Sequence, residues 1–125
     1  MLLLALSACS GAAPTARFSD LEKAEQSLPQ VDTVLRREVA NNCEGDSPTG
    51  PAVYLWFALP SDGQVPNEKW TQALRASGWR SDSDSAFHRK SDASQVVAVV
   101  NQTRIANDYA VVLYLKDGVE ACPAN

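Results

Sequence analysis

Three short runs of strand-forming residues, separated by polar connections, constrain the fold of this chain more than any other feature. Residues 95–100 are rich in valine, residues 109–116 combine aromatic and aliphatic side chains, and residues 86–90 form a weaker third run. Aromatic and β-branched residues favour strands, and short connections usually join antiparallel neighbours. The carboxyl-terminal half therefore predicts an antiparallel meander.

A fourth strand is predicted at residues 52–59, which read Ala-Val-Tyr-Leu-Trp-Phe-Ala-Leu. This run is apolar at consecutive positions, so both of its faces are apolar. A strand that buries both faces usually lies in the middle of a sheet. We therefore expect this strand to be central.

A helix is predicted between the fourth strand and the meander, at residues 66–77. Pro66 suits the first turn of a helix, and Gly78 occupies the position where a left-handed residue commonly ends one. Trp79 and Leu74 then stand at the two positions whose side chains pack together in a Schellman ending. We expect both side chains in the core.

The amino-terminal part predicts two further helices, at residues 19–26 and 28–40. Ser19 and Glu22 form a capping box, and Ser27 and Gln30 form a second one. Pro29 is compatible with two helices or with one helix kinked at that residue. An apolar stripe at helical spacing supports this prediction, and its members are Leu21, Leu28, Val31, Leu35 and Val39.

The predicted element order is helix (one or two), strand, helix, strand, strand, strand. Helices and strands segregated in this way are typical of the α+β class. We therefore expect a four-stranded antiparallel sheet with helices packed on one face.

The first nine residues read Met-Leu-Leu-Leu-Ala-Leu-Ser-Ala-Cys. An apolar run followed by small residues is typical of the end of a secretory signal. The segment Leu6-Ser7-Ala8-Cys9 resembles the lipobox of bacterial lipoproteins. No Lys or Arg precedes the apolar run, so we expect the basic part of the signal to lie upstream of Met1.

The resemblance implies cleavage before Cys9, with diacylglycerol on its thiol and a further acyl chain such as palmitate on its amine. Two or more acyl chains give stable anchoring. The expected organisation is a signal peptide at residues 1–8, a lipidated tether at 9–17 and one α+β domain at 18–125. The domain would lie on the extracytoplasmic side of the cell membrane.

Lipidation of Cys9 would leave an even pair of cysteines, Cys43 and Cys122. Such a pair usually forms a disulfide outside the cytoplasm. We expect this bridge to join the end of the amino-terminal helical part to the end of the chain.

Composition and motifs exclude several function classes. The formal net charge is −4, which disfavours binding to nucleic acid. No glycine-rich phosphate loop is present. With one histidine and no CxxC pair, no zinc site is expected, and no cofactor is predicted.

His88 is the residue that comes nearest to a catalytic group. One isolated histidine does not supply the geometry of general-base catalysis, and His88-Arg89-Lys90 is better interpreted as a charged strand edge. Asp82 and Asp84 begin like a calcium loop, but Phe87 stands where that loop needs glycine. We expect a solvated turn and no catalytic residue.

The sequence thus favours a membrane-anchored, non-enzymatic domain that binds an envelope protein or a small ligand. One alternative is a small envelope enzyme or enzyme inhibitor that uses the segment from Asp82 to Arg89. Another alternative is a structural spacer. A concave pocket holding His88 with Asp82 or Asp84 would favour the first alternative.

Overall fold

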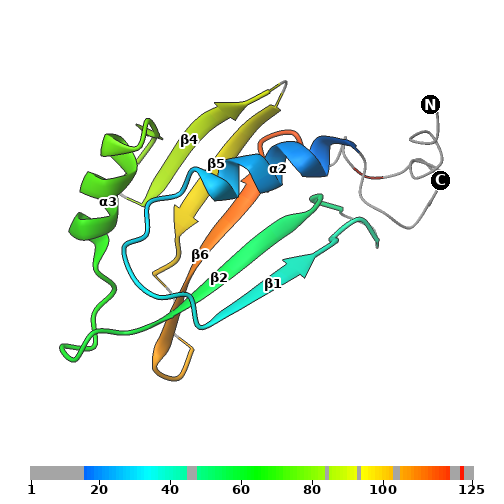
Figure 1. The fold of residues 1–125 in the computed structure, drawn as a ribbon. Helices are drawn as coiled ribbons and strands as arrows, with labels where there is room; N and C mark the ends of the chain where they lie inside the picture. The colour runs from blue at the N-terminus through cyan, green and yellow to red at the C-terminus, as the bar shows by residue number, and fades with distance from the viewer. Residues whose placement is uncertain are drawn as a thin grey trace.

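The computed structural model describes residues 16–44, 48–83, 85–92, 94–102, 105–118 and 122. These residues form one six-stranded antiparallel sheet and two helices (Figure 1). The strand order is β1-β2-β6-β5-β4-β3. The elements are α2 (Ala16–Gln26), β1 (Arg36–Ala40), β2 (Ala52–Ala58), α3 (Asn67–Ala76), β3 (Arg80–Ser81), β4 (Ala86–Ser91), β5 (Ser94–Val100) and β6 (Asp108–Leu115).

The predicted four-stranded α+β arrangement is wrong. The helix expected at residues 28–40 is absent, and β1 lies at its end, paired antiparallel with β2. The predicted apolar stripe is only partly in the core. Leu21 is buried, and Leu28 and Val31 pack against the core, whereas Leu35 and Val39 are 55% and 47% exposed. Ser27 does not begin a second helix either: its N–H donates to the carbonyl of Ala24 and closes α2. Pairing with β2 therefore overrides a chance helical periodicity.

The second additional strand is β3, which pairs with β4 through Arg80 and Ser81. It has only two residues, and a strand this short has no alternating sequence pattern by which it could be predicted. Two other boundaries also move. Ala16 and Arg17, expected in the tether, belong to α2, and Ser19 lies inside that helix instead of capping it.

The strand predictions within the carboxyl-terminal half and at residues 52–59 are confirmed as β4, β5, β6 and β2. The predicted end of α3 is also confirmed. Gly78 has φ = +91°, and its N–H donates to Arg75. The Trp79 N–H donates to the carbonyl of Leu74, and both side chains are buried. These are the two hydrogen bonds of a Schellman ending.

One face of the sheet forms the core together with both helices. Leu21 of α2 and Trp70 and Leu74 of α3 are fully or almost fully buried against it. Phe57 stacks on Tyr109 and meets Trp70 edge-on, with ring centroids 5.3 Å apart in both pairs. The core therefore joins both helices to the central strands.

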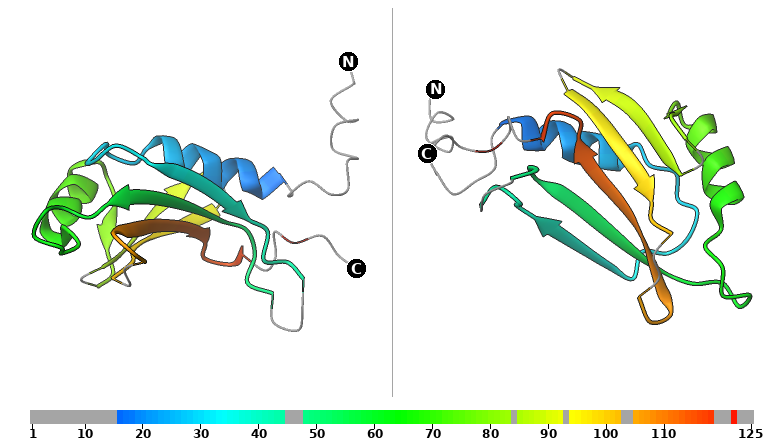
Figure 2. Two further views of the ribbon diagram at one scale, coloured as in Figure 1. Left: turned by 90° about the horizontal axis from the view of Figure 1, so that it is seen from below. Right: turned by 180° about the vertical axis from the view of Figure 1, so that it is seen from behind.

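The opposite face of the sheet carries neither α2 nor α3. Seen from behind, the strands lie in front of α2, and the edge-on view places α2 on one side of the sheet only (Figure 2). The side chains that alternate away from the core occupy this uncovered face.

The Cys43–Cys122 disulfide is present, with its Cα atoms 5.4 Å apart. It joins the connection between β1 and β2 to the segment after β6. The expected position at the end of a helix is wrong, because β1 precedes Cys43. Cys9 and the signal peptide expected at residues 1–8 lie outside the described residues.

Candidate functional site

The uncovered face of the sheet brings together side chains from β2, β6 and β5. Tyr54 of β2 is the register partner of Val112 in β6, and Val112 in turn faces Val99 of β5. One step along, Ala52 faces Tyr114, which is 37% exposed. These residues form an apolar and aromatic surface in the middle of the sheet.

A hollow of about 400 Å³ lies over this surface. We call it the sheet-face hollow. Its lining residues are Asn42, Thr49, Gly50, Ala52, Tyr54, Val99, Asn101, Val112 and Tyr114. The side chains from the strands are mostly apolar, whereas Asn42, Thr49 and Asn101 contribute polar groups. An apolar lining with a few polar groups is typical of small-molecule sites of this size.

The connection between β1 and β2 forms one wall of the sheet-face hollow. Asn42 has φ = +52°, a left-handed conformation that asparagine tolerates better than most residues. Its carbonyl accepts hydrogen bonds from the N–H groups of Thr49 and Gly50, at 3.0 and 3.1 Å. The backbone of Gly118 packs directly against Gly50. With the disulfide nearby, this wall is fixed to the segment that follows β6.

Trp56 lies on the same face, and its ring is already occupied by neighbours from β1. Its Nε1–H donates to Glu38 at 2.7 Å, and the Arg36 guanidinium lies 4.7 Å above its ring. Only 8% of Trp56 is exposed. The structure therefore leaves the rings of Tyr54 and Tyr114, rather than Trp56, to contact a ligand.

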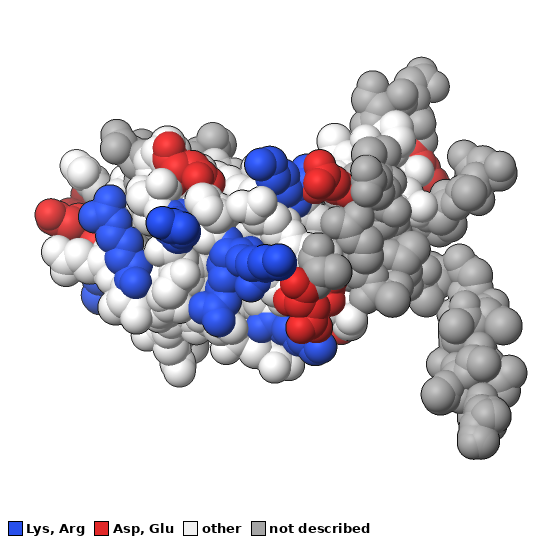
Figure 3. Space-filling model, turned by 90° about the horizontal axis from the view of Figure 1, so that it is seen from above, with Lys and Arg blue, Asp and Glu red and all other residues white. Residues whose placement is uncertain are grey.

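The structure brings His88 and Asp82 together, with Nδ1 of His88 2.6 Å from Oδ1 of Asp82. A separate hollow beside them is lined by Gly78, Arg80, His88, Arg89, Lys90, Ser94, Gln95 and Asp117. The β3–β4 side of the molecule is seen from above in Figure 3, and Lys and Arg side chains gather in the middle of that view. Asp84, the other aspartate considered, lies outside the described residues.

Two polar side chains of this second hollow are already engaged by partners within the described part of the chain. Its one hydroxyl, on Ser94, donates to the buried carboxylate of Asp20 at 2.6 Å. Arg89 is likewise engaged, because its guanidinium donates to the carbonyl of Ser77 at 2.7 Å. A serine nucleophile needs its hydroxyl within reach of a base, and the Ser94 hydroxyl is directed to Asp20 instead.

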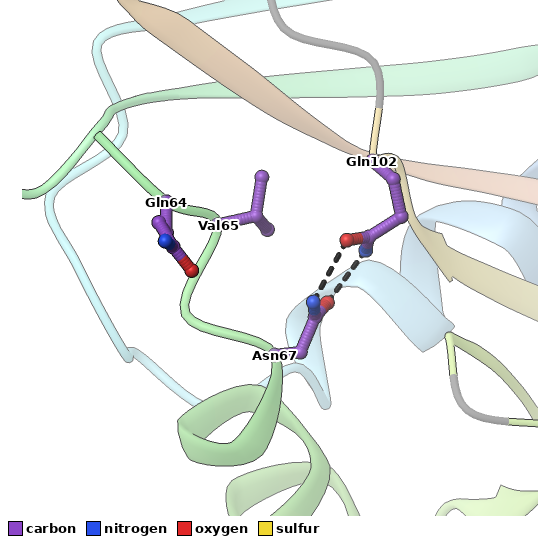
Figure 4. Close-up of a pocket in the computed structure, with 4 residues that line it drawn as sticks. All are labelled: Gln64, Val65, Asn67 and Gln102. Carbon is purple, nitrogen blue, oxygen red and sulfur yellow. Dashed lines mark hydrogen bonds between the residues drawn. The ribbon is translucent and has the colours of Figure 1, made fainter. Parts of the chain in front are cut away.

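A further pocket, of about 280 Å³, lies between α3 and the end of β5 and is lined by Gln64, Val65, Asn67 and Gln102 (Figure 4). The side-chain amides of Asn67 and Gln102 bond to each other across it, with Nδ2 of Asn67 2.7 Å from Oε1 of Gln102. These amides therefore satisfy each other, and a ligand would have to break that pair.

A buried polar network holds α3 against β6. The Trp70 Nε1–H donates to the Tyr109 hydroxyl at 2.8 Å, and that hydroxyl donates to Asp32 at 3.1 Å. Burial raises the pKa of Tyr109 to about 12, and the neighbouring carboxylate of Asp32 also raises it. Burial and the Asp32 carboxylate therefore keep the Tyr109 hydroxyl protonated, and its two partners, Asp32 and Trp70, also line a pocket beside this network.

The described ranges contain no group of three or more His, Cys, Asp or Glu residues that could hold a metal ion. Neither of the two described helices has the length and hydrophobicity needed to cross a bilayer. Comparison with protein families, with curated proteins and with solved structures finds no match to this chain.

Sequence reasoning did not identify the sheet-face hollow. It located the strands but gave no strand order, so Tyr54 and Tyr114 could not be placed on one surface. A usable signal existed: β2 and β6 are apolar at consecutive positions, although only one face is covered by helices. Apolar residues on the second face of a sheet are an indication of a binding surface.

Proposed function

We propose that this protein is a lipid-anchored domain of the bacterial envelope that binds a small amphipathic ligand in the sheet-face hollow. The observation that carries the proposal is the hollow itself. It combines aromatic and aliphatic side chains from three strands with the polar groups of Asn42, Thr49 and Asn101. The lipobox-like segment ending at Cys9 supports the location.

The chemistry of the lining favours a ligand with an apolar body and hydrogen-bonding groups at its margin. Val99, Val112 and the tyrosine rings would contact the body. Asn42, Thr49 and Asn101 would face the polar margin. A binding role without catalysis fits this arrangement, because the described lining contains no histidine, carboxylate or thiol.

The binding part of the proposal is tested with the fluorescent probe 1-anilinonaphthalene-8-sulfonate, which has an apolar body and one anionic group. We expect saturable binding at one site, with NMR shift changes centred on Tyr54, Val99 and Val112. Val112→Glu should weaken binding at least tenfold, because it places a carboxylate in the apolar floor. The matched control is Ile105→Glu, since Ile105 is exposed and does not line the hollow.

Equal binding by both variants, or shift changes centred elsewhere, would contradict this site.

The anchoring part is tested separately with Cys9→Ala in the native host. We expect this variant to leave the membrane fraction, whereas wild-type protein should remain there until detergent is added. Wild-type protein that fractionates with the cytosol would contradict the anchor and leave the binding test unaffected.

A further inference from the structure

The two edges of the sheet differ in how well they are protected. On one side the edge is β3, a strand of two residues, followed by a cationic stretch of β4 that carries Arg89 and Lys90. Short strands and charged side chains are common ways to prevent an edge from pairing with another chain. On the other side the edge is β1, with five residues, and no described element lies beyond it (Figures 1 and 2).

The outer side of β1 presents backbone groups that pair with no described strand. The Leu35 N–H donates to the carbonyl of Trp56, so the backbone of Trp56 is directed towards β1. Arg36 is the register partner of Trp56 and therefore directs its own backbone towards β2. Because this direction alternates along a strand, the N–H and C=O groups of Arg37 and Val39 point outwards.

Exposed apolar side chains are concentrated on this same segment. Val34, Leu35 and Val39 are 45%, 55% and 47% exposed, and they lie within six residues of one another. Among the large apolar side chains of the described ranges, only two others are exposed, Ile105 and Tyr114. A row of apolar side chains beside unpaired backbone groups is a template for strand addition.

The charged residues of β1 are held by partners inside the molecule. Arg37 forms two hydrogen bonds with the carboxylate of Glu25 on α2, both at 2.8 Å. Arg36 stacks over Trp56, and Glu38 accepts the Trp56 Nε1–H. These charges are therefore less effective than free lysines would be at repelling an approaching strand. The helix α2 packs over β4, β5 and β6 and leaves the edge open.

From these observations we infer that β1 pairs antiparallel with β1 of a second copy of this chain, around a two-fold axis at Arg37. The sequence Leu35-Arg36-Arg37-Glu38-Val39 is self-complementary in that register. Arg36 lies opposite Glu38 of the second copy, and Leu35 lies opposite Val39, each twice by symmetry. Opposite charges and apolar pairs across two strands stabilise their pairing.

The central pair in this register is Arg37 with its symmetry mate. Glu25 already neutralises each of these arginines, and Glu22 lies 3.9 Å away. Because only every second residue directs its backbone outwards, the next register is shifted by two residues, with the two-fold axis at Glu38. That register would place Glu38 opposite Glu38 and Arg37 opposite Val39. The charge pattern therefore selects the two-fold axis at Arg37.

The interface is small, below the roughly 1,200 Å² of a standard protein–protein interface, so we expect a weak dimer in solution. Its existence does not depend on the lipid or on a ligand in the sheet-face hollow. The first measurement is sedimentation velocity on the full chain carrying Cys9→Ser, which cannot be acylated, over a concentration series from micromolar to millimolar. We expect a monomer–dimer equilibrium within this range.

Two variants test the edge and the register. Val39→Pro removes an outward N–H donor and should weaken the dimer at least tenfold, while edge positions of this kind tolerate proline. Glu38→Arg places two arginines opposite each other and should also weaken the dimer at least tenfold. The double variant Arg36→Glu, Glu38→Arg restores opposite charges in the same register, so it should recover dimerisation. Ile105→Lys is the control for an exposed apolar residue elsewhere.

Near-ultraviolet circular dichroism of each variant shows whether the monomer remains folded. A protein that stays monomeric at all concentrations would overturn the inference. A dimer unaffected by Val39→Pro and Glu38→Arg would overturn it as well, because another surface would then be the interface. A photo-crosslinker at Leu35 that captures a different envelope protein in the host, instead of a second copy, would also overturn it.

Discussion

Single buried polar residues determine how α2 is fixed to the β4–β5 hairpin. Asp20 is 7% exposed, yet it lies in the helix that covers the sheet. Its backbone carbonyl accepts a hydrogen bond from the Ser91 hydroxyl at 2.7 Å, and its carboxylate accepts one from the Ser94 hydroxyl at 2.6 Å. Burying a carboxylate is costly unless it is hydrogen-bonded, so these contacts specify the position of the helix.

Replacing Ser94 by alanine should therefore destabilise the protein by about 1 to 3 kcal/mol, since the buried carboxylate of Asp20 loses a donor. Urea unfolding measures this change in the free energy of unfolding. Ser81→Ala is the matched control, because the Ser81 hydroxyl donates to the carbonyl of Ser83 on the exposed surface. That control should cost less than about 0.5 kcal/mol. Equal effects of the two substitutions would contradict this view of Asp20.

Because of Tyr109, we expect the free energy of unfolding to depend on pH under alkaline conditions. Its pKa in the folded protein is raised from the ordinary value of 10 to about 12 by burial and by Asp32. Between these values the unfolded chain loses the proton while the folded protein keeps it. The free energy of unfolding should therefore be unaffected by Tyr109 below pH 10 and fall by about 2 to 3 kcal/mol as the pH rises to 12.

Denaturant unfolding at pH 9 and pH 12 measures this loss. Lysines also titrate in this range, so Tyr109→Phe provides the reference. It removes this contribution and should lose less stability over the interval, although it is less stable at pH 9 because the Trp70 Nε1–H is left without its acceptor. The same alkaline loss in both proteins would contradict the raised pKa.

At the scale of elements, the close packing of Gly50 against Gly118 positions the wall of the sheet-face hollow. A Cβ atom on Gly50 would meet the Gly118 carbonyl oxygen at 2.2 Å. Gly63 has a similar positive φ, but a Cβ there meets nothing within 4 Å. The two glycines therefore separate the effect of backbone conformation from the effect of contact.

Gly63→Ala should cost only the left-handed backbone penalty, about 1 to 2 kcal/mol. Gly50→Ala adds an overlap with backbone atoms and should cost at least about 2 kcal/mol more, because packed backbone cannot move aside easily. Thermal or urea unfolding of the two variants gives the comparison. Equal costs would show that the two segments separate readily, contrary to the described wall.

The elements also show what the sequence could and could not predict. The end of α3 was predicted from Gly78 and Trp79 because a Schellman ending depends on local residues. The strand β1 was missed because its structure depends on β2, which lies more than ten residues away. Leu35 and Val39 fit the apolar spacing of a helix, but both are exposed, so this spacing alone did not predict which side chains are buried. Local signals were sufficient for local structure only.

At the scale of the whole molecule, the disulfide is the predicted contact that joins the most distant parts of the sequence. Cys43 and Cys122 are 79 residues apart, and pairing two cysteines requires no knowledge of the strand order. The sheet-face hollow does require it, because its residues come from β2, β5, β6 and their connections. The candidate site was therefore not predictable from the sequence beyond the bridge beside its wall.

Reducing the disulfide should destabilise the protein by about 4 kcal/mol in the chain-entropy model, with losses of 2 to 5 kcal/mol typical of native bridges. Urea unfolding with and without a reductant measures the difference. The variant with Cys43→Ala and Cys122→Ala is the control, and its stability should be low and insensitive to the reductant. A reductant effect below about 1 kcal/mol in the wild-type protein would contradict a stabilising bridge.

Membrane anchoring is the central claim of this account at the molecular scale, and intact mass spectrometry of the protein from its native host's membrane fraction tests it most directly. We predict a chain that begins at Cys9, carries acyl groups and is two hydrogens lighter than the reduced form because of the Cys43–Cys122 bridge. An unprocessed chain without acyl groups and with free thiols, recovered from the cytosol, would contradict the anchor, the export and the bridge in the native host.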